Sequence, residues 1–215
     1  MSPLTGNKAF RLTMLFFDIL DCCYPYIKKS VKKFGIKDGM TVIDYGCGLG
    51  SYAVKIVELI GEKEAVYAID TNYLAIEAVK RKIEKYKLRN IHPILISSYR
   101  SPLYAVDIHE LAIVDMKRKE EKHSPAGTQP IFMDRFKNIL QNNVAHIVGA
   151  IGLLSKIEEP TKFLADLRRI VKNDGTLIID DGNRPRDVTK RIIIDSGLRD
   201  ITEETSDHLK CKPRS

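Results

Sequence analysis

Three glycines at alternate positions follow a short apolar segment that contains an acid. The segment reads VIDYGCGLGSY, from Val42 to Tyr52, and its glycines are Gly46, Gly48 and Gly50. Glycine is unfavourable in regular structure unless the backbone needs a positive φ or another group must approach it closely. In parallel α/β sheets, ligands bind at the turn between such a strand and the helix that follows it. The glycines therefore predict an α/β sheet with a binding site at this turn.

Apolar periodicity predicts strands and helices in alternation along most of the chain. This alternation indicates an α/β fold with a doubly wound, mostly parallel sheet. The tail LRDITEETSDHLKCKP is expected to form an antiparallel hairpin at one edge of that sheet, with a turn near Ser206. Strands are expected at 41–44, 65–69, 91–96, 144–151 and 176–180, and helices at 51–59, 73–87, 161–172 and 187–196.

Two segments fall outside this alternation, although the whole chain, 1–215, is expected to form a single domain. Residues 8–33 predict an N-terminal helical cap that is broken near Pro25. Residues 99–143 are longer than a simple connection requires, and we interpret them as a helix plus an insertion before the fourth strand. We expect this insertion to act as a lid over a substrate; the alternative is that 111–115 is itself a strand.

Composition narrows the class of protein. The chain has no long uncharged apolar run and no secretory signal, which predicts a cytoplasmic protein without a membrane span. Its four cysteines form no CxxC pair and no histidine has metal-ligand spacing, so no metal site is expected. The net charge of +7 keeps nucleic acid open as an unlikely partner. The oligomeric state stays open, with a dimer among the alternatives.

Two acids, one before the glycines and one at the end of the next expected strand, help to distinguish between families that use such a loop. Asp44 lies two residues before Gly46, and Asp70 ends the next expected strand. A dinucleotide-binding Gly-x-Gly-x-x-Gly motif would need its third glycine at the position of Ser51. The pattern Asp-x-Gly-x-Gly-x-Gly instead resembles motif I of the class I S-adenosylmethionine-dependent methyltransferases. FLADLRRIVKNDGTLIIDD resembles a late segment of the same superfamily. Within this superfamily, the sequence resembles the small-molecule branch, methyltransferase type 11, which includes enzymes of ubiquinone and menaquinone biosynthesis.

The resemblance implies a seven-stranded Rossmann-like sheet and S-adenosylmethionine as the cofactor. Asp44 would orient the methionine amino group, and the glycines would let the methionine part approach the backbone. Asp70 would bind the ribose hydroxyls. Ser97 and Ser98 stand where the family usually has an acid near the adenine amino group. The cofactor-binding residues that the resemblance implies are Asp44, Gly46, Cys47, Gly48, Gly50, Asp70, Thr71, Asn72, Ser97 and Ser98.

The acceptor side of the reaction is expected at the ends of the fourth and fifth strands. Asp181 and Asn183 follow the fifth strand and are the catalytic candidates, with turn formation as the alternative. The fourth strand is followed neither by the Asn/Asp-Pro-Pro-aromatic stretch of amino-group base methylases nor by a cysteine that could attack a pyrimidine. A small-molecule substrate is therefore expected. The alternatives are an RNA methyltransferase and a non-catalytic S-adenosylmethionine-binding protein.

Overall fold

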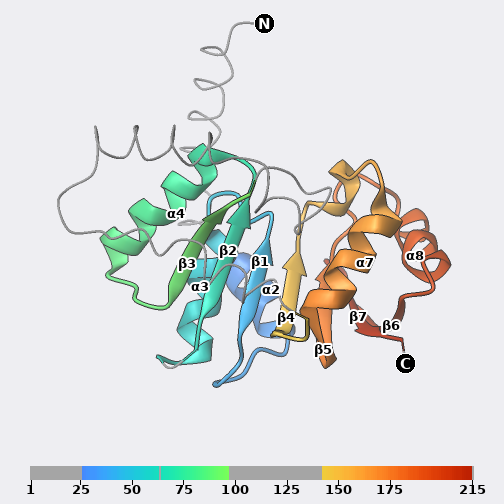
Figure 1. Cartoon of the computed structure of the whole chain (residues 1–215), viewed down its shortest axis with the longest axis horizontal. Coiled ribbons are helices and arrows are strands. Elements are labelled where there is room, and N and C mark those ends of the chain that lie inside the picture. The colour runs from blue at the N-terminus through green and yellow to red at the C-terminus, as the bar shows by residue number, and fades with distance from the viewer. Residues whose placement is uncertain (1–25, 63, 97–141, 215) are drawn as a thin grey trace, which may run out of the picture.

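The computed structural model describes residues 26–62, 64–96 and 142–214 (Figure 1). The expectations for 8–25, for Ser97 and Ser98, and for the insertion up to residue 141 lie outside the described residues.

One mixed sheet is the centre of the described structure. Its strands follow the order β3-β2-β1-β4-β5-β7-β6 (Figure 1). Strands β1 to β5 pair in parallel, and β7 pairs antiparallel with both β5 and β6. The predicted α/β sheet with an antiparallel C-terminal hairpin is confirmed. The strands are β1 (Val42–Tyr45), β2 (Val66–Asp70), β3 (Ile91–Leu95), β4 (Ala145–Ala150), β5 (Val171–Ile179), β6 (Arg199–Glu204) and β7 (Leu209–Pro213).

Helices cover both faces of the sheet because successive strand residues point to opposite sides. Val42 of β1 packs in one apolar cluster with residues of α2, α3 and α4. The next residue, Ile43, packs in a second cluster with residues of α7 and α8. The sheet is therefore buried on both faces, as a parallel sheet requires. The helices are α2 (Tyr26–Lys33), α3 (Ser51–Ile60), α4 (Tyr73–Tyr86), α7 (Pro160–Ile170) and α8 (Arg186–Asp195), with a 3₁₀ turn η1 (Leu154–Lys156).

The start of β5 corrects one prediction. We expected the helix to run to Lys172 and a turn to precede a strand at Thr176, but α7 ends at Ile170 and β5 begins at Val171. The pairing with β4 shifts between Ala145, opposite Val171, and Ile147, opposite Thr176. The intervening residues therefore form a bulge inside the strand, a feature that turn-type residues do not distinguish from a turn.

The carboxyl ends of β1, β2, β4 and β5 lie at one edge of the sheet, called the carboxyl edge below. The glycine loop (residues 46–50) follows β1 there, and Asp70 ends β2. Ile179 of β5 pairs with Leu209 of β7, so the β6–β7 turn (residues 205–208) reaches the same edge. The glycine loop, the loops after β4 and β5, and this turn are thus brought together from distant parts of the chain.

Asp207 fastens α2 to the β6–β7 turn. Its carboxylate accepts hydrogen bonds from Ser30 Oγ at 2.6 Å, Lys33 Nζ at 2.9 Å and Thr205 Oγ1 at 2.9 Å. Burial works against the charged form, but the hydrogen bonds from Ser30, Lys33 and Thr205 outweigh it and lower the pKa of Asp207. The described end of the predicted N-terminal cap is therefore tied to the carboxyl edge.

Replacing Asp207 with alanine is expected to lower the free energy of unfolding by about 1–3 kcal/mol, since three donors lose their acceptor. The difference in stability between the variant and the wild type should decrease at acidic pH. A carboxyl whose folded pKa lies below the ordinary value of 3.8 stabilises the fold above that value and loses this contribution as pH falls. Denaturant unfolding at several pH values measures both. Asp200→Ala, which removes an exposed partner of Arg214, is the matched control and should change little. Equal effects of the two variants would contradict this role.

Candidate active site

The glycine loop is held to the end of β2 by backbone hydrogen bonds. The N–H groups of Gly46 and Cys47 donate to the carbonyl oxygen of Ile69 at 2.8 and 2.9 Å, and Gly50 N–H donates to the carbonyl oxygen of Cys47 at 2.8 Å. These backbone hydrogen bonds define the shape of the loop.

Two of the glycines meet different requirements. At Gly50, where φ is 73°, an added Cβ would lie 2.6 Å from Cγ2 of Val79, so α4 excludes a side chain. At Gly48, where φ is 52°, an added Cβ would meet no atom of the described residues within 4 Å. As far as the described residues go, the space beside Gly48 is therefore open to a ligand that packs directly on the backbone.

Asp70 is oriented by the loop and by the start of α4. Its Oδ2 accepts a hydrogen bond from Gly48 N–H at 2.9 Å, and its Oδ1 accepts one from Asn72 N–H at 2.8 Å. Each carboxylate oxygen has a further lone pair. Asp70 can therefore accept two more hydrogen bonds, as adjacent hydroxyl groups of a ribose would require.

Asn72, two residues after Asp70, has a structural role. Asn72 caps α4, because its Oδ1 accepts a hydrogen bond from Leu74 N–H at 3.0 Å. Its side chain is exposed, and that of Thr71 is half-buried. Their predicted place beside an adenine stays a prediction.

Asp44 is a buried carboxyl group beneath the glycine loop. It lies on β1 with 3% of its surface exposed, and its Oδ2 accepts a hydrogen bond from Ala53 N–H in the first turn of α3 at 3.1 Å. Burial raises its pKa to about 7; the Ala53 bond opposes the rise and the charge of Asp70 adds to it. An ammonium group nearby would favour the ionised form, so the site fits a cationic amine.

Cys47 has no role as a nucleophile. Its thiol is buried, and burial together with the charges of Asp44 and Asp70 raises its pKa. Such a thiol is inert, and it packs in the core beside α3. The predicted place of Cys47 in the cofactor site stays a prediction.

The two catalytic candidates, Asp181 and Asn183, lie in different environments. Asp181 forms an ion pair with Arg186 Nε, and Arg186 also donates to the carbonyl oxygen of Thr205 at 3.0 Å. These contacts tie the loop after β5 to the β6–β7 turn, which favours the structural alternative for Asp181. The side chain of Asn183 is exposed on the same loop. The catalytic role of both residues stays a prediction.

Asp180, which directly precedes Asp181, also lies at the end of β5. Its Oδ1 accepts a hydrogen bond from Gly152 N–H at 2.6 Å, which links the loop after β4 to the end of β5. Burial raises the pKa of Asp180, the Gly152 bond opposes this, and the charge of Asp181 adds to it. Strand alternation, which sends adjacent residues to opposite sides, could have separated the two acids.

The sequence motif does not predict the contacts of Tyr52, because its signal comes from the neighbouring glycines. It lies in the first turn of α3 and stacks on Phe34, with ring centroids 5.9 Å apart. Burial raises the pKa of its hydroxyl, and the nearby charges of Asp180 and Asp44 add to the rise. Its ring packs against the apolar cluster that contains Val42 and residues of α2, α3 and α4.

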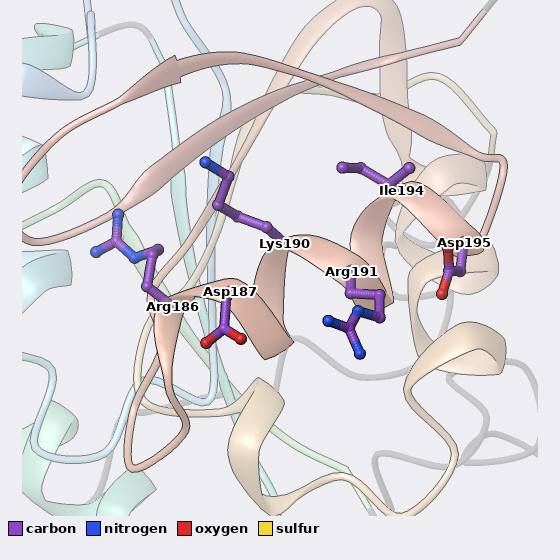
Figure 2. Close-up of a pocket in the computed structure, with 6 residues that line it drawn as sticks. All are labelled: Arg186, Asp187, Lys190, Arg191, Ile194 and Asp195. Carbon is purple, nitrogen blue, oxygen red and sulfur yellow. The ribbon is translucent and has the colours of Figure 1, made fainter.

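An open hollow runs along α8 and contains none of the predicted site residues (Figure 2). Two of its cations, Arg186 and Lys190, already pair with Glu204 at 3.5 and 2.7 Å. We assign no site to it. Its described lining is Arg186, Asp187, Lys190, Arg191, Ile194 and Asp195.

Other kinds of site receive no support from the described part of the chain. Within residues 26–62, 64–96 and 142–214, no group of three or more His, Cys, Asp or Glu side chains is arranged to hold a metal ion. Over the same residues, no helix has the length and apolar character needed to cross a membrane.

Residues 36–97 match a family model described as a methyltransferase domain. This segment contains the glycine loop, Asp44 and Asp70. A probable cobalt-precorrin-6B C(15)-methyltransferase (decarboxylating) of Sulfurisphaera tokodaii is 39% identical over 62 residues, which is 29% of this chain and 32% of the relative. The chain thus spans about a third of the length of the curated relatives it matches.

Solved structures extend the likeness to the whole fold. A SAM-dependent methyltransferase from Aquifex aeolicus superposes with a TM-score of 0.59 at 23% identity, covering 86% of this chain and 88% of that one. A putative S-adenosyl-L-methionine-dependent methyltransferase from Methanococcus maripaludis gives a TM-score of 0.65 at 14% identity, covering 97% and 93%. The predicted resemblance to the class I S-adenosylmethionine-dependent methyltransferases is confirmed, as is the Rossmann-like fold. S-adenosylmethionine is the cofactor that this resemblance implies.

Proposed function

We propose that the protein is an S-adenosylmethionine-dependent methyltransferase that acts on a small-molecule acceptor. The observation that carries this proposal is the Asp70 carboxylate, held by Gly48 N–H at 2.9 Å beside backbone that is open to a ligand. The buried Asp44 carboxyl lies under the same loop. One acid suits a ribose and the other suits an ammonium group, and a nucleoside joined to an amino acid has both.

The residues of the chain act by binding and orientation. Bound S-adenosylmethionine would supply an activated methyl group on a sulfonium. Asp70 would accept the ribose hydroxyls, and ionised Asp44 would attract the ammonium group. Holding the methyl carbon in line with an acceptor lowers the barrier by several kcal/mol, about 7 or more in well-oriented systems. Asp180 is the candidate to accept a proton from an acceptor that loses one on methylation.

A small-molecule acceptor is favoured over RNA by the residues after β4. They read IGLL, from Ile151 to Leu154, without the motif of amino-group base methylases. The matched Sulfurisphaera tokodaii relative is named for a precorrin, which is a small molecule. We also propose a cytoplasmic location, which the buried free thiols of Cys47 and Cys211 suit.

A transfer assay with methyl-labelled cofactor separates the three candidate functions. Label should appear in the low-molecular-mass fraction of a cell extract and be absent from its RNA and protein fractions. Label in RNA, with binding that weakens steeply in salt, would favour the RNA methyltransferase. Cofactor binding without transfer to any fraction would favour the non-catalytic protein.

A further inference from the structure

Arg199, the first residue of β6, is a buried cation. Its side chain is 0% exposed, and its Nε, Nη1 and Nη2 atoms have no hydrogen-bond partner among the described residues. A guanidinium group has several N–H donors and stays protonated in proteins. Burying such a charge is costly unless it is paired and hydrogen-bonded. Arg199 therefore points to a negatively charged acceptor that the described residues do not supply.

The sheet register places Arg199 beside Cys211 and far from the candidate active site. In the β6–β7 ladder, Arg199 is opposite Pro213 and Ile201 is opposite Cys211, so all four side chains share one face of the sheet. On this face Cys211 packs in the apolar cluster with residues of α7 and α8, which lie over β6 and β7 (Figure 1). Pro213 is at the opposite end of β7 from Leu209, which reaches the carboxyl edge.

The surroundings of Arg199 are electropositive. Burial lowers the pKa of Arg199 from 12.5 to about 10; Cys211 opposes the fall, and the charge of Arg168 on α7 adds to it. Burial raises the pKa of Cys211 to about 12, so its thiol is neutral near neutral pH and gives no countercharge. The described groups that act on Arg199 thus include a second cation and no carboxylate.

We propose that Arg199 is the binding site of a small monovalent inorganic anion, chloride, between β6, β7 and α7. The guanidinium nitrogens are buried, so a bound anion must lose its hydration shell, which costs less for chloride than for sulfate or phosphate. The S–H of Cys211 is a further weak donor. Strand β6 is the last strand in the described sheet and pairs there with β7 alone, so local opening of this edge admits the anion (Figure 1).

The dependence of stability on the type of anion tests the site, because a ligand of the folded state stabilises it. Urea unfolding of the full chain is measured in sodium chloride, sodium bromide and sodium fluoride at equal ionic strength. Screening of surface charges is then the same in all three salts. The general effect of salts favours fluoride, since strongly hydrated anions stabilise folded proteins. A buried anion site predicts the reverse order, because fluoride loses its hydration shell least readily.

The wild type should unfold at a urea concentration about 0.5 M or more higher in chloride and bromide than in fluoride, as expected for an anion about tenfold above its Kd. Arg199→Met should remove this difference. It should also be at least as stable as the wild type in fluoride, because it removes a buried cation without a countercharge. Arg191→Met is the matched control, since Arg191 is an exposed arginine of α8, and it should keep the wild-type preference.

Crystals of the wild type grown in sodium bromide give the position of the anion directly. An anomalous bromide peak beside the guanidinium of Arg199 is expected. A water molecule there, or a carboxylate from another segment of the chain, would overturn the inference. A wild type that was most stable in fluoride, or an Arg199→Met variant that kept the wild-type preference, would do the same. None of these measurements involves S-adenosylmethionine, so the proposed function is tested separately.

Discussion

Asp70→Ala is expected to weaken S-adenosylhomocysteine binding by about 100-fold or more. Two ribose hydroxyls would lose a charged acceptor, and each such hydrogen bond contributes about 1.5–3 kcal/mol. The variant also releases Gly48 N–H, which Asp70 holds at 2.9 Å, so the loop loses part of its preorganised shape. Calorimetric titration measures the loss directly.

Two further variants make the result specific to the ribose contact. Asp70→Asn keeps an acceptor oxygen without the charge and should bind with intermediate affinity. Asp187→Ala removes an exposed acid of α8 and should bind like the wild type. Asp70→Ala that bound within a few-fold of the wild type would mean that the ribose lies elsewhere.

Asp44→Asn is expected to stabilise the ligand-free protein and to weaken cofactor binding. Burial raises the pKa of Asp44 from 3.8 to about 7, so the folded state binds a proton more tightly than the unfolded state does. The free energy of unfolding therefore decreases as pH rises from 3.8 to about 7 and stays reduced above that. Asparagine carries no charge to bury, so its advantage should grow over the same range to about 4 kcal/mol, since one pKa unit corresponds to about 1.4 kcal/mol.

Denaturant unfolding at about pH 5 and about pH 8 measures the stability difference. Cofactor affinity of the wild type should decline below about pH 7, because protonated Asp44 no longer attracts an ammonium group, whereas that of Asp44→Asn should be low throughout. If Asp44→Asn were less stable than the wild type at the higher pH, burial would not destabilise the ionised form of Asp44. Unchanged cofactor binding would remove Asp44 from the site.

The glycine loop and the place of Asp70 at a strand end could be predicted from the sequence because their signals are local. Three glycines at fixed spacing need positive φ, and Asp70 is identified by its place at the end of a strand. Apolar alternation was sufficient to find the strands and their mostly parallel pairing. The bulge in β5 was missed because residues 172–175 suit a turn and a bulge equally.

The remaining contacts depend on packing between distant segments. The sequence separates Lys82 from Ser51 by 31 residues, and only the approach of α4 to the glycine loop brings them together. The choice between Asp180 and Asp181 depends on which one reaches Gly152 and which one meets Arg186. The proposed lid, residues 99–143, and Ser97 and Ser98 stay predictions.

Titration of the wild-type protein with S-adenosylhomocysteine and, separately, with NAD tests the central claim most directly. Both ligands contain an adenosine ribose that Asp70 could accept, but only the first carries the amino acid that Asp44 and the glycine loop suit. The account predicts saturable binding of S-adenosylhomocysteine at one site and no saturable binding of NAD. Binding of NAD alone, or of neither ligand, would contradict it.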